Sequence, residues 1–427
     1  MRCQSITRRS SVKLRLFLVL ALAGAHGVVP SGHAAEPLRL EEAVARSLAS
    51  NPSLAAEAAE VRAVQARAER EGLPTPYVVG GDLENAGGTG SLSGIHSAET
   101  TLRLGRVIEL GGKRAARQAL GTAEIARQRN VSDAARLDIA SRATARFIEV
   151  VADQQRLEFA RERVKLADRT RREVASWVAA ARNPESDLSA AEIAVAEAEL
   201  EREHAEHELA SARMTLAASW GSFEPDFTSV AGNLRALPAV EPFEALAARL
   251  PNTAAQRSAL LEAEAIAARR RVALTSAKPD VTVSLGVRRL EALDDQGLVM
   301  SVSVPLGSRP RASLAIAEAD AQLDALEARR EAQRAEGHQG LFDKYQELVH
   351  ARTEYDALTK RMLPKAEQAY AFTRRGFEAG RFSFVALTQA QRTLFDLRAR
   401  SVEAAARYHT RLVEVERLTT VAAEPTP

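Results

Sequence analysis

The stretch TTLRLGRVIELGGKRAARQALGTAEIARQR, residues 100–129, decides the fold. Its first part alternates between apolar and polar positions, which is typical of a β-strand. At Gly111-Gly112 the alternation stops, and a run rich in Ala, Arg, Glu and Gln follows. That run predicts a helix of about 70 residues, on the order of 100 Å at helical rise. The alternating residues are Leu102, Leu104, Ile108 and Leu110 on one face and Thr101, Arg103, Val107 and Glu109 on the other.

The composition also favours long helices over large compact cores. Of the 427 residues, 46% are hydrophobic but only 4% are aromatic, which is typical of extended helical proteins. Lys plus Arg (58) nearly balances Asp plus Glu (56), so we expect no broad basic surface for nucleic acid. The single cysteine, Cys3, lies in a segment that we expect to be removed. A mature chain without thiols fits an oxidising compartment.

Residues 1–34 are expected to be a signal peptide. A basic segment precedes the short apolar run LFLVLALAGA (16–25), and Gly32-His33-Ala34 places small residues at a cleavage spacing. A membrane anchor is the less favoured alternative, because the apolar run is shorter than about 20 residues. No later stretch is long and apolar enough for a membrane helix, so an exported chain of this kind would cross a membrane as a barrel.

One pattern of elements occurs twice, which predicts an internal tandem repeat. We expect a first repeat at 35–230, a second at 231–422 and a disordered tail at 423–427. In each repeat, short helices lead through a Pro-containing break to two strands, a very long helix, a break and a second helix. The expected strands are 77–84, 97–110, 280–289 and 298–306, and the expected breaks in the long helices are 182–184 and 378–381.

The strands of the second repeat alternate most regularly. Each has roughly the nine to eleven residues that a tilted strand needs to cross a bilayer. Taken singly, each could equally be a half-buried strand of a soluble sheet. Four membrane strands cannot close a barrel, so an oligomer is expected. The residues predicted to face lipid are Val281, Val283, Leu285 and Val287.

Three segments resemble the TolC-type outer-membrane efflux family, and the resemblance covers nearly all of the expected mature chain. They are the junctions Glu109-Leu110-Gly111-Gly112-Lys113-Arg114 and Val304-Pro305-Leu306-Gly307, and AYAFTRRGFEAGRFSFVALTQAQRTL (369–394). The first junction resembles the heavy-metal, CzcC-like branch.

The resemblance implies a mainly α fold with a small β part. Long antiparallel helical hairpins would form an α-barrel in the periplasm of a Gram-negative bacterium. Four strands from each chain of a homotrimer would form a twelve-stranded transmembrane β-barrel in the outer-membrane lipid. Gly111, Gly112 and Gly307 would be the hinges between strand and helix, because glycine adopts backbone angles that other residues avoid.

The resemblance further implies a channel and not an enzyme. The chain would be the exit duct of a tripartite system, working with a periplasmic adaptor (membrane fusion) protein and an inner-membrane RND transporter. Heavy-metal cations are the expected cargo, with drug efflux and type I protein secretion as alternatives. An exported coiled-coil scaffold without a pore is the alternative outside the channel class.

No catalytic constellation, cofactor site or metal site is expected from the sequence. No phosphate-binding glycine loop occurs. His204 and His207 lie one helical turn apart, a spacing that can bind metal. Three glutamates surround the pair, so a solvated helix face is the favoured interpretation.

The expected periplasmic tip carries the remaining candidates. Residues 376–384 are expected to form a helical hairpin turn where the adaptor docks, which makes Gly376, Gly380 and Arg381 candidates.

Asp187 corresponds to a position where the family often has an acid at the channel constriction. Alternatively, Asp187 caps a helix that starts near Leu188. The matching positions of the second repeat, Ala386 and Gln389, depart from the family's acidic pattern. A gate closed by several rings of carboxylates is therefore not expected.

Overall fold

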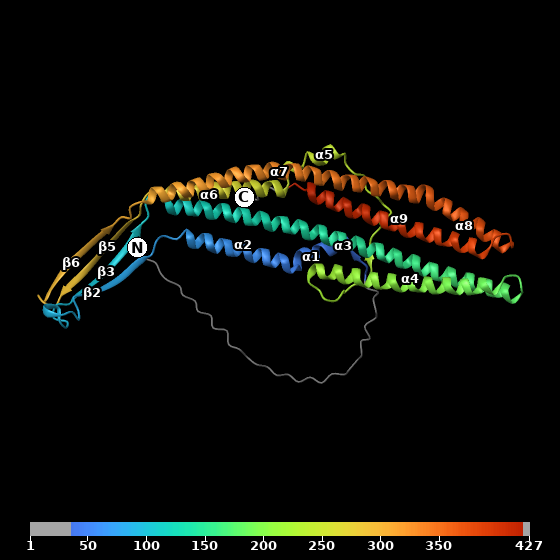
Figure 1. Cartoon of the computed structure of the whole chain (residues 1–427), viewed down its shortest axis with the longest axis horizontal. Helices are drawn as coiled ribbons and strands as arrows, with labels where there is room; N and C mark the ends of the chain where they lie inside the picture. The colour runs from blue at the N-terminus through green and yellow to red at the C-terminus, as the bar shows by residue number, and fades with distance from the viewer. Residues whose placement is uncertain (1–35, 422–427) are drawn as a thin grey trace, which may run out of the picture. The chain divides into compact units, whose positions relative to one another are not determined.

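The computed structural model describes residues 36–421, so the expected signal peptide at 1–34 and the expected tail at 423–427 lie outside the described residues. Residues 37–421 belong to one compact unit. Its described part is mostly helical, with a four-stranded sheet and a short two-stranded sheet (Figure 1).

The first half of the described chain runs from two short helices through a strand pair into the longest helix. Asn51 separates the short helices, and its side chain accepts a hydrogen bond from the Ser53 N–H, which caps the second of them. The elements are β1 (Leu38–Arg39), α1 (Leu40–Ser50), α2 (Pro52–Glu71), β2 (Tyr77–Glu84), β3 (Glu99–Ile108), α3 (Lys113–Ala179), α4 (Glu185–Ala217) and β4 (Val230–Ala231).

The second half presents helices and strands in a similar order. Its long helix differs from α3 because a π-helical turn interrupts it, and the sequence analysis did not anticipate that turn. The elements are α5 (Phe243–Ala247), α6 (Ala254–Ser276), β5 (Val281–Leu290), β6 (Asp295–Ser303), α7 (Ser308–Ala357), the π turn η4 (Leu358–Met362), α8 (Leu363–Glu378) and α9 (Phe384–Thr419).

The four-stranded sheet is antiparallel throughout, in the order β2-β3-β5-β6. The central pair β3–β5 joins the two halves of the chain. Leu104 lies opposite Leu285, which in turn lies opposite Met300. The strands β2 and β6 are the two edges of this sheet.

The fourth strand lies three residues earlier than predicted, at Asp295–Ser303 and not at 298–306. Asp294 adopts a left-handed conformation with φ 52°, which makes the hairpin turn short. Gln296 can therefore pair with Arg289. Pro305 lacks the N–H that would extend the strand ladder, so the strand ends before it.

The helices pack in pairs through small residues. The helix α3 contacts α2, α4, α6 and α9, and α7 contacts α6 and α9. Seven-residue spacings of buried side chains recur, as expected for short heptad tracts. Examples are Ala191, Ala198 and Ala205 on α4, Leu341 and Leu348 on α7, and Leu387 and Leu394 on α9. Over residues 36–421, none of the helices combines the length and the hydropathy that a membrane span requires.

Candidate functional sites at the two ends of the long helices

The strand-to-helix junctions use left-handed glycines. Gly111 and Gly112 have φ angles of 81° and 78°, and Gly307 has 88°. These angles disfavour any residue with a Cβ atom. Apart from the adjacent residues, no described residue comes within 4 Å of where a Cβ would lie at Gly112 or Gly307, so the requirement there is conformational. That the three glycines act as hinges stays a prediction.

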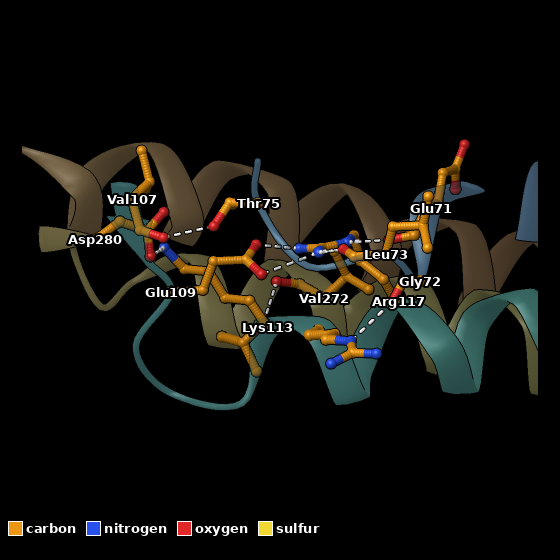
Figure 2. Close-up of polar contacts among 12 residues, drawn as sticks. Glu71, Gly72, Leu73, Thr75, Val107, Glu109, Lys113, Arg117, Val272 and Asp280 are labelled. Carbon is orange, nitrogen blue, oxygen red and sulfur yellow. Dashed lines mark hydrogen bonds and ion pairs between the residues drawn. The ribbon is translucent and has the colours of Figure 1, made fainter. Parts of the chain in front are cut away.

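Charged side chains brace the first junction (Figure 2). One carboxylate oxygen of Asp280 accepts hydrogen bonds from the Leu110 N–H at 3.2 Å and from Lys113 Nζ at 2.6 Å. Glu109 receives two hydrogen bonds from Arg117, at 2.5 and 3.1 Å. The hydrogen bond to Glu109 is the main reason why the pKa of Arg117 is raised. These contacts tie the end of β3 and the start of α3 to the segment that enters β5.

Three arginines bind the connector between α2 and β2. Arg117 Nε donates to the Glu71 carbonyl at 2.6 Å, and Arg114 Nε donates to the Gly72 carbonyl at 2.8 Å. Arg106 Nε donates to the Thr75 carbonyl at 3.2 Å. Cations at the carboxyl end of a helix are favourable because they face the negative end of its dipole. The connector at the end of α2 is therefore held by strand β3 and helix α3.

One face of the four-stranded sheet is apolar on every strand. The side chains of Leu104, Leu285 and Met300, which lie side by side across three strands, are 52, 59 and 69% exposed. All four residues predicted to face lipid belong to this face. Its apolar members are Tyr77, Val79, Leu83, Leu102, Leu104, Ile108, Val281, Val283, Leu285, Val287, Leu298, Met300 and Val302.

The opposite face of the sheet is mainly polar. Arg103 pairs with Asp82 at 3.0 Å. Ser284 and Ser301 share a hydrogen bond of 2.7 Å. Arg288 is held between Glu84 and Glu99, at 3.0 and 2.7 Å. The two faces of the sheet therefore fit different surroundings: one face suits an apolar environment and the other suits water.

At the other end of the long helices, the turn between α8 and α9 spans 379–383, inside the expected segment. Gly380, with φ 69°, donates its N–H to the Phe377 carbonyl, and Arg381 donates its N–H to the Gly376 carbonyl at 2.8 Å. This pair of bonds is the Schellman arrangement that ends many helices. A Cβ atom at Gly376 would overlap the ring of Phe382. The two glycines thus have different roles: Gly380 supplies a backbone angle and Gly376 supplies space.

The turn between α3 and α4 repeats this arrangement without a glycine. Ala181 donates its N–H to the Val178 carbonyl at 2.9 Å, and Arg182 donates to the Trp177 carbonyl at 2.8 Å. Ala181 has φ 53°, a conformation that is unfavourable for alanine.

Asp187 does not cap a helix near Leu188, and that alternative was wrong. The helix α4 starts at Glu185, with Pro184 in the cap position. Proline has a fixed φ and no N–H to satisfy, so it suits a helix start. Asp187 lies in the first helical turn, where its carboxylate accepts a hydrogen bond from Asn183 Nδ2 at 2.8 Å.

The two hairpin tips are joined to each other. Arg374 Nη2 on α8 donates to both carboxylate oxygens of Glu173 on α3, at 3.0 and 3.2 Å. Burial opposes the charge of Arg374, but its hydrogen bonds to Tyr370 and Glu378 and the nearby Glu173 outweigh burial and raise its pKa. An apolar cluster accompanies the pair. Its buried members are Val174, Ala191, Phe377, Phe384 and Leu387, and Trp177 packs against them.

Glu173 and Arg374 lie 201 residues apart, and neither was predicted to be a functional residue. The similarity of the two turns was the sequence signal that could have revealed this contact. Trp177 and Gly376 are equivalent carbonyl acceptors in the two turns, so Glu173 and Arg374 lie at nearly the same distance from their tips. Only the similarity of the two turns could have suggested their proximity.

The remaining tip candidates lie apart from one another. Arg381 is exposed in its turn, whereas Gln389 is exposed further along α9. Gln389 lines a hollow of about 210 Å³ together with Glu197 and Arg392. Asp187 is not among the residues that line this hollow. The structure therefore places Gly376 in the last helical turn of α8, next to the turn that contains Gly380 and Arg381, but it does not gather all five candidates.

No cluster of three or more His, Cys, Asp or Glu residues in the described part of the chain is arranged to hold a metal ion. The Nε2 atom of His204 lies 3.1 Å from a carboxylate oxygen of Glu208, and the Nε2 atom of His207 lies 3.8 Å from one of Glu203. Their imidazoles are 75 and 77% exposed. Both pairs therefore lie on a solvated face of α4, which is the interpretation that the sequence favoured.

Comparison with known proteins gives consistent results. Residues 249–420 match the family model "Outer membrane efflux protein". The cobalt-zinc-cadmium resistance protein CzcC of Cupriavidus metallidurans is 32% identical over 377 residues, which cover 86% of each chain. The nickel and cobalt resistance protein CnrC of the same organism is 29% identical over 70% of this chain and 72% of its own. The structure of CusC matches with a TM-score of 0.75 at 14% identity, covering 90% of this chain and 92% of its own.

Proposed function

The chain belongs to the outer membrane efflux protein family, and from this premise we propose that it is the outer-membrane exit duct of a tripartite efflux system for heavy-metal cations. The observation that carries the proposal is the 32% identity to a cobalt-zinc-cadmium resistance protein over 86% of both chains. The duct would carry cations from the periplasm or cytoplasm to the exterior. The channel itself is passive and not an enzyme.

We infer that three copies build the membrane part. In one protomer β2 and β6 are sheet edges, and unpaired backbone groups are not tolerated in lipid. Pairing β6 of one copy with β2 of the next closes a twelve-stranded β-barrel. The apolar face, which includes Val281, Val283, Leu285 and Val287, would then face lipid, and the polar face of Arg103 and Arg288 would line the pore.

The helices extend this pore as a periplasmic α-barrel of antiparallel hairpins. The similar order of elements in 40–217 and 243–419 supports an internal duplication, with repeats near 35–230 and 231–422. Gly111, Gly112 and Gly307 are the proposed hinges between the two barrels. The ion pairs of Asp280 and Glu109 stiffen the first hinge.

The hairpin tips are the proposed entrance. A periplasmic adaptor protein docks at the turns that contain Arg182 and Arg381, and an inner-membrane RND transporter supplies the energy. The bond between Arg374 and Glu173, with the apolar cluster beside it, holds the two hairpins of one protomer together. Widening the entrance by separating these hairpins requires that this contact break. Asp187 and Gln389 remain candidates for contact with the cargo.

Deleting the gene in its host and complementing it on a plasmid tests the proposal. The deletion strain should become more sensitive to cobalt, zinc or cadmium, and the wild-type gene should restore growth. Unchanged metal tolerance with a new sensitivity to drugs, or with loss of a secreted protein, would favour the alternative cargoes. Purified protein that forms no trimer and no conducting pore in planar bilayers would favour a scaffold without a pore.

A further inference from the structure

A hollow of about 610 Å³ lies where the apolar face of the sheet meets the first junction. Leu104, Ile108, Val283 and Leu285 contribute apolar walls. Arg106, Lys113 and Arg114 also line it. The hollow therefore combines an open hydrocarbon surface with a group of cations at one end.

Two of these cations are not neutralised by any carboxylate within residues 36–421. Lys113 is paired with Asp280, and Glu109, which also lines the hollow, is paired with Arg117 (Figure 2). Among the described residues, neither Arg106 nor Arg114 has a carboxylate partner. Arg114 uses its Nε for the Gly72 carbonyl, and Arg106 uses Nε and Nη1 for the Thr75 carbonyl and the Tyr77 hydroxyl. A guanidinium has five N–H donors, so most of theirs remain for an anion.

The connector fixes the positions of both guanidiniums. Their Nε bonds end on carbonyls three residues apart, in the segment 72–75. The Tyr77 ring also lies under the Arg106 guanidinium, 4.8 Å from its centre. Preorganised arginines bind phosphate oxygens well, because little side-chain entropy is lost and the bonds are charge-assisted.

We propose that this hollow binds a glycerophospholipid of the inner leaflet, with its phosphate on Arg106 and Arg114 and its acyl chains along Leu104, Ile108, Val283 and Leu285. The proposal rests on the proposed function, since that function sets the apolar face in lipid. The hollow then lies at the headgroup level on the periplasmic side, where tyrosine and arginine side chains commonly anchor barrels and helices. The bound lipid would seal the connector between α2 and β2 against the membrane surface.

Native mass spectrometry of the full-length trimer, purified in detergent and delipidated, tests this proposal. Phosphatidylglycerol, phosphatidylethanolamine and the diacylglycerol with the same acyl chains are added in turn. Both phospholipids should bind at up to one copy per protomer, and diacylglycerol should bind at least about tenfold more weakly, because each charge-assisted bond to phosphate is lost. Equal binding of diacylglycerol would overturn the proposal, and this comparison needs no variant.

The variant Arg106→Gln/Arg114→Gln should lose phospholipid binding by a similar factor, and Arg106→Lys/Arg114→Lys should recover part of it. Arg289→Gln is the matched control. Arg289 lies on the same face of β5 as Val283 but at the other end of the strand, where it is paired with Glu291 and Asp294. Equal losses in the double Gln variant and in the control would contradict the site.

Inorganic phosphate at millimolar concentration distinguishes a free anion from a lipid. It should leave the bound phospholipid in place, because it cannot replace the contacts of the acyl chains. Full displacement would mean a simple anion site and would overturn the proposal. Conductance of the same preparation in planar bilayers is recorded separately. Loss of lipid binding with normal conductance contradicts only the lipid site, whereas absence of trimer and conductance contradicts the proposed function.

Discussion

Ala181 and Gly380 hold equivalent positions in the two hairpin turns, each two residues beyond the end of a long helical arm. Both are left-handed, with φ 53° and 69°, and both donate their N–H to the carbonyl three residues earlier. Alanine in this conformation costs roughly 1–2 kcal/mol relative to the right-handed region. The first turn therefore stores strain that the second turn avoids.

Ala181→Gly should stabilise the protein by up to about 1 kcal/mol, because relief of the left-handed strain exceeds the extra entropy of the unfolded chain. Thermal unfolding of the purified protein, followed by circular dichroism, measures the effect. Ala180→Gly is the control, since Ala180 has φ −88° and gains no such relief. An equal or larger gain in the control would refute the explanation.

Gly380→Val should abolish metal resistance while leaving membrane insertion and trimer formation intact. A β-branched residue disfavours φ 69°, so the turn that we propose as the docking site would distort. Gly380→Ala should retain activity, because Ala181 tolerates the same conformation and, apart from the adjacent residues, no described residue lies within 4 Å of the added Cβ. Growth on metal and trimer yield in outer-membrane fractions are the two measurements. Normal resistance in the Val variant, or failure of insertion, would mean that this turn is not the docking tip.

Glu173→Gln should loosen the tip and raise single-channel conductance in planar bilayers. The side chains of Arg374 and Glu173 are 19 and 31% exposed, so the pair should contribute on the order of 1 kcal/mol. Exchanging the charges, as Glu173→Arg with Arg374→Glu, should return the conductance towards that of the wild type. Glu378→Gln is the control, because Glu378 pairs with Arg374 within one helix. A similar rise in that control would argue against a link between hairpins.

Val283→Arg should lower the free energy of unfolding, but by less than the about 2–4 kcal/mol expected at the bilayer midplane, because Val283 belongs to the apolar face and lies near the junction end of β5. Ser284→Arg should have a milder effect, because Ser284 belongs to the polar face with Ser301. The yield of folded trimer in outer membranes compares the two variants. Equal defects would show that the faces have been assigned wrongly.

The protein should lose stability as the pH falls below about 6.5. Burial lowers the pKa of His409, although its hydrogen bond to the Leu234 carbonyl opposes this effect. In that pH range the unfolded state binds a proton before the folded state does, so unfolding is favoured. His409→Gln should reduce the difference in melting temperature between pH 7.5 and 5.5. The control variant His204→Gln, at an exposed position, should leave this difference in melting temperature unchanged. An unchanged difference in the His409 variant would exclude this histidine as the cause.

Local patterns were enough to predict most of the elements. The alternation before Gly111 and the uninterrupted run after Gly112 determine β3 and α3, because the periods of two and of 3.6 residues depend only on neighbouring side chains. Gly380, which is left-handed, and Ser383, whose hydroxyl accepts a hydrogen bond from the Ala386 N–H at the start of α9, likewise mark the second turn, since both effects act within a few residues. The first strand, Tyr77–Glu84, agrees with its prediction at both ends.

Other features could not be predicted because they depend on pairing between distant segments. The start of β6 depends on the pairing of Asp295 with Leu290 and of Gln296 with Arg289, which places it three residues earlier than predicted. The alternative that Asp187 caps a helix was wrong because Pro184 occupies the cap position and α4 starts at Glu185. The π turn at Leu358–Met362 has no signal that we could identify in the sequence.

By itself, then, the sequence determined the succession of strands and helices, the glycines that join them and the resemblance to its family, since all of these are encoded in short-range spacing. Only the tertiary structure decided which side chains meet. The contact between Glu173 and Arg374, and the common hollow of Arg106 and Arg114, arise because packing brings chain segments together irrespective of their separation in sequence. Contacts of this kind are set by the geometry of a strand pair or a helix pair, and no local pattern of residues carries that geometry.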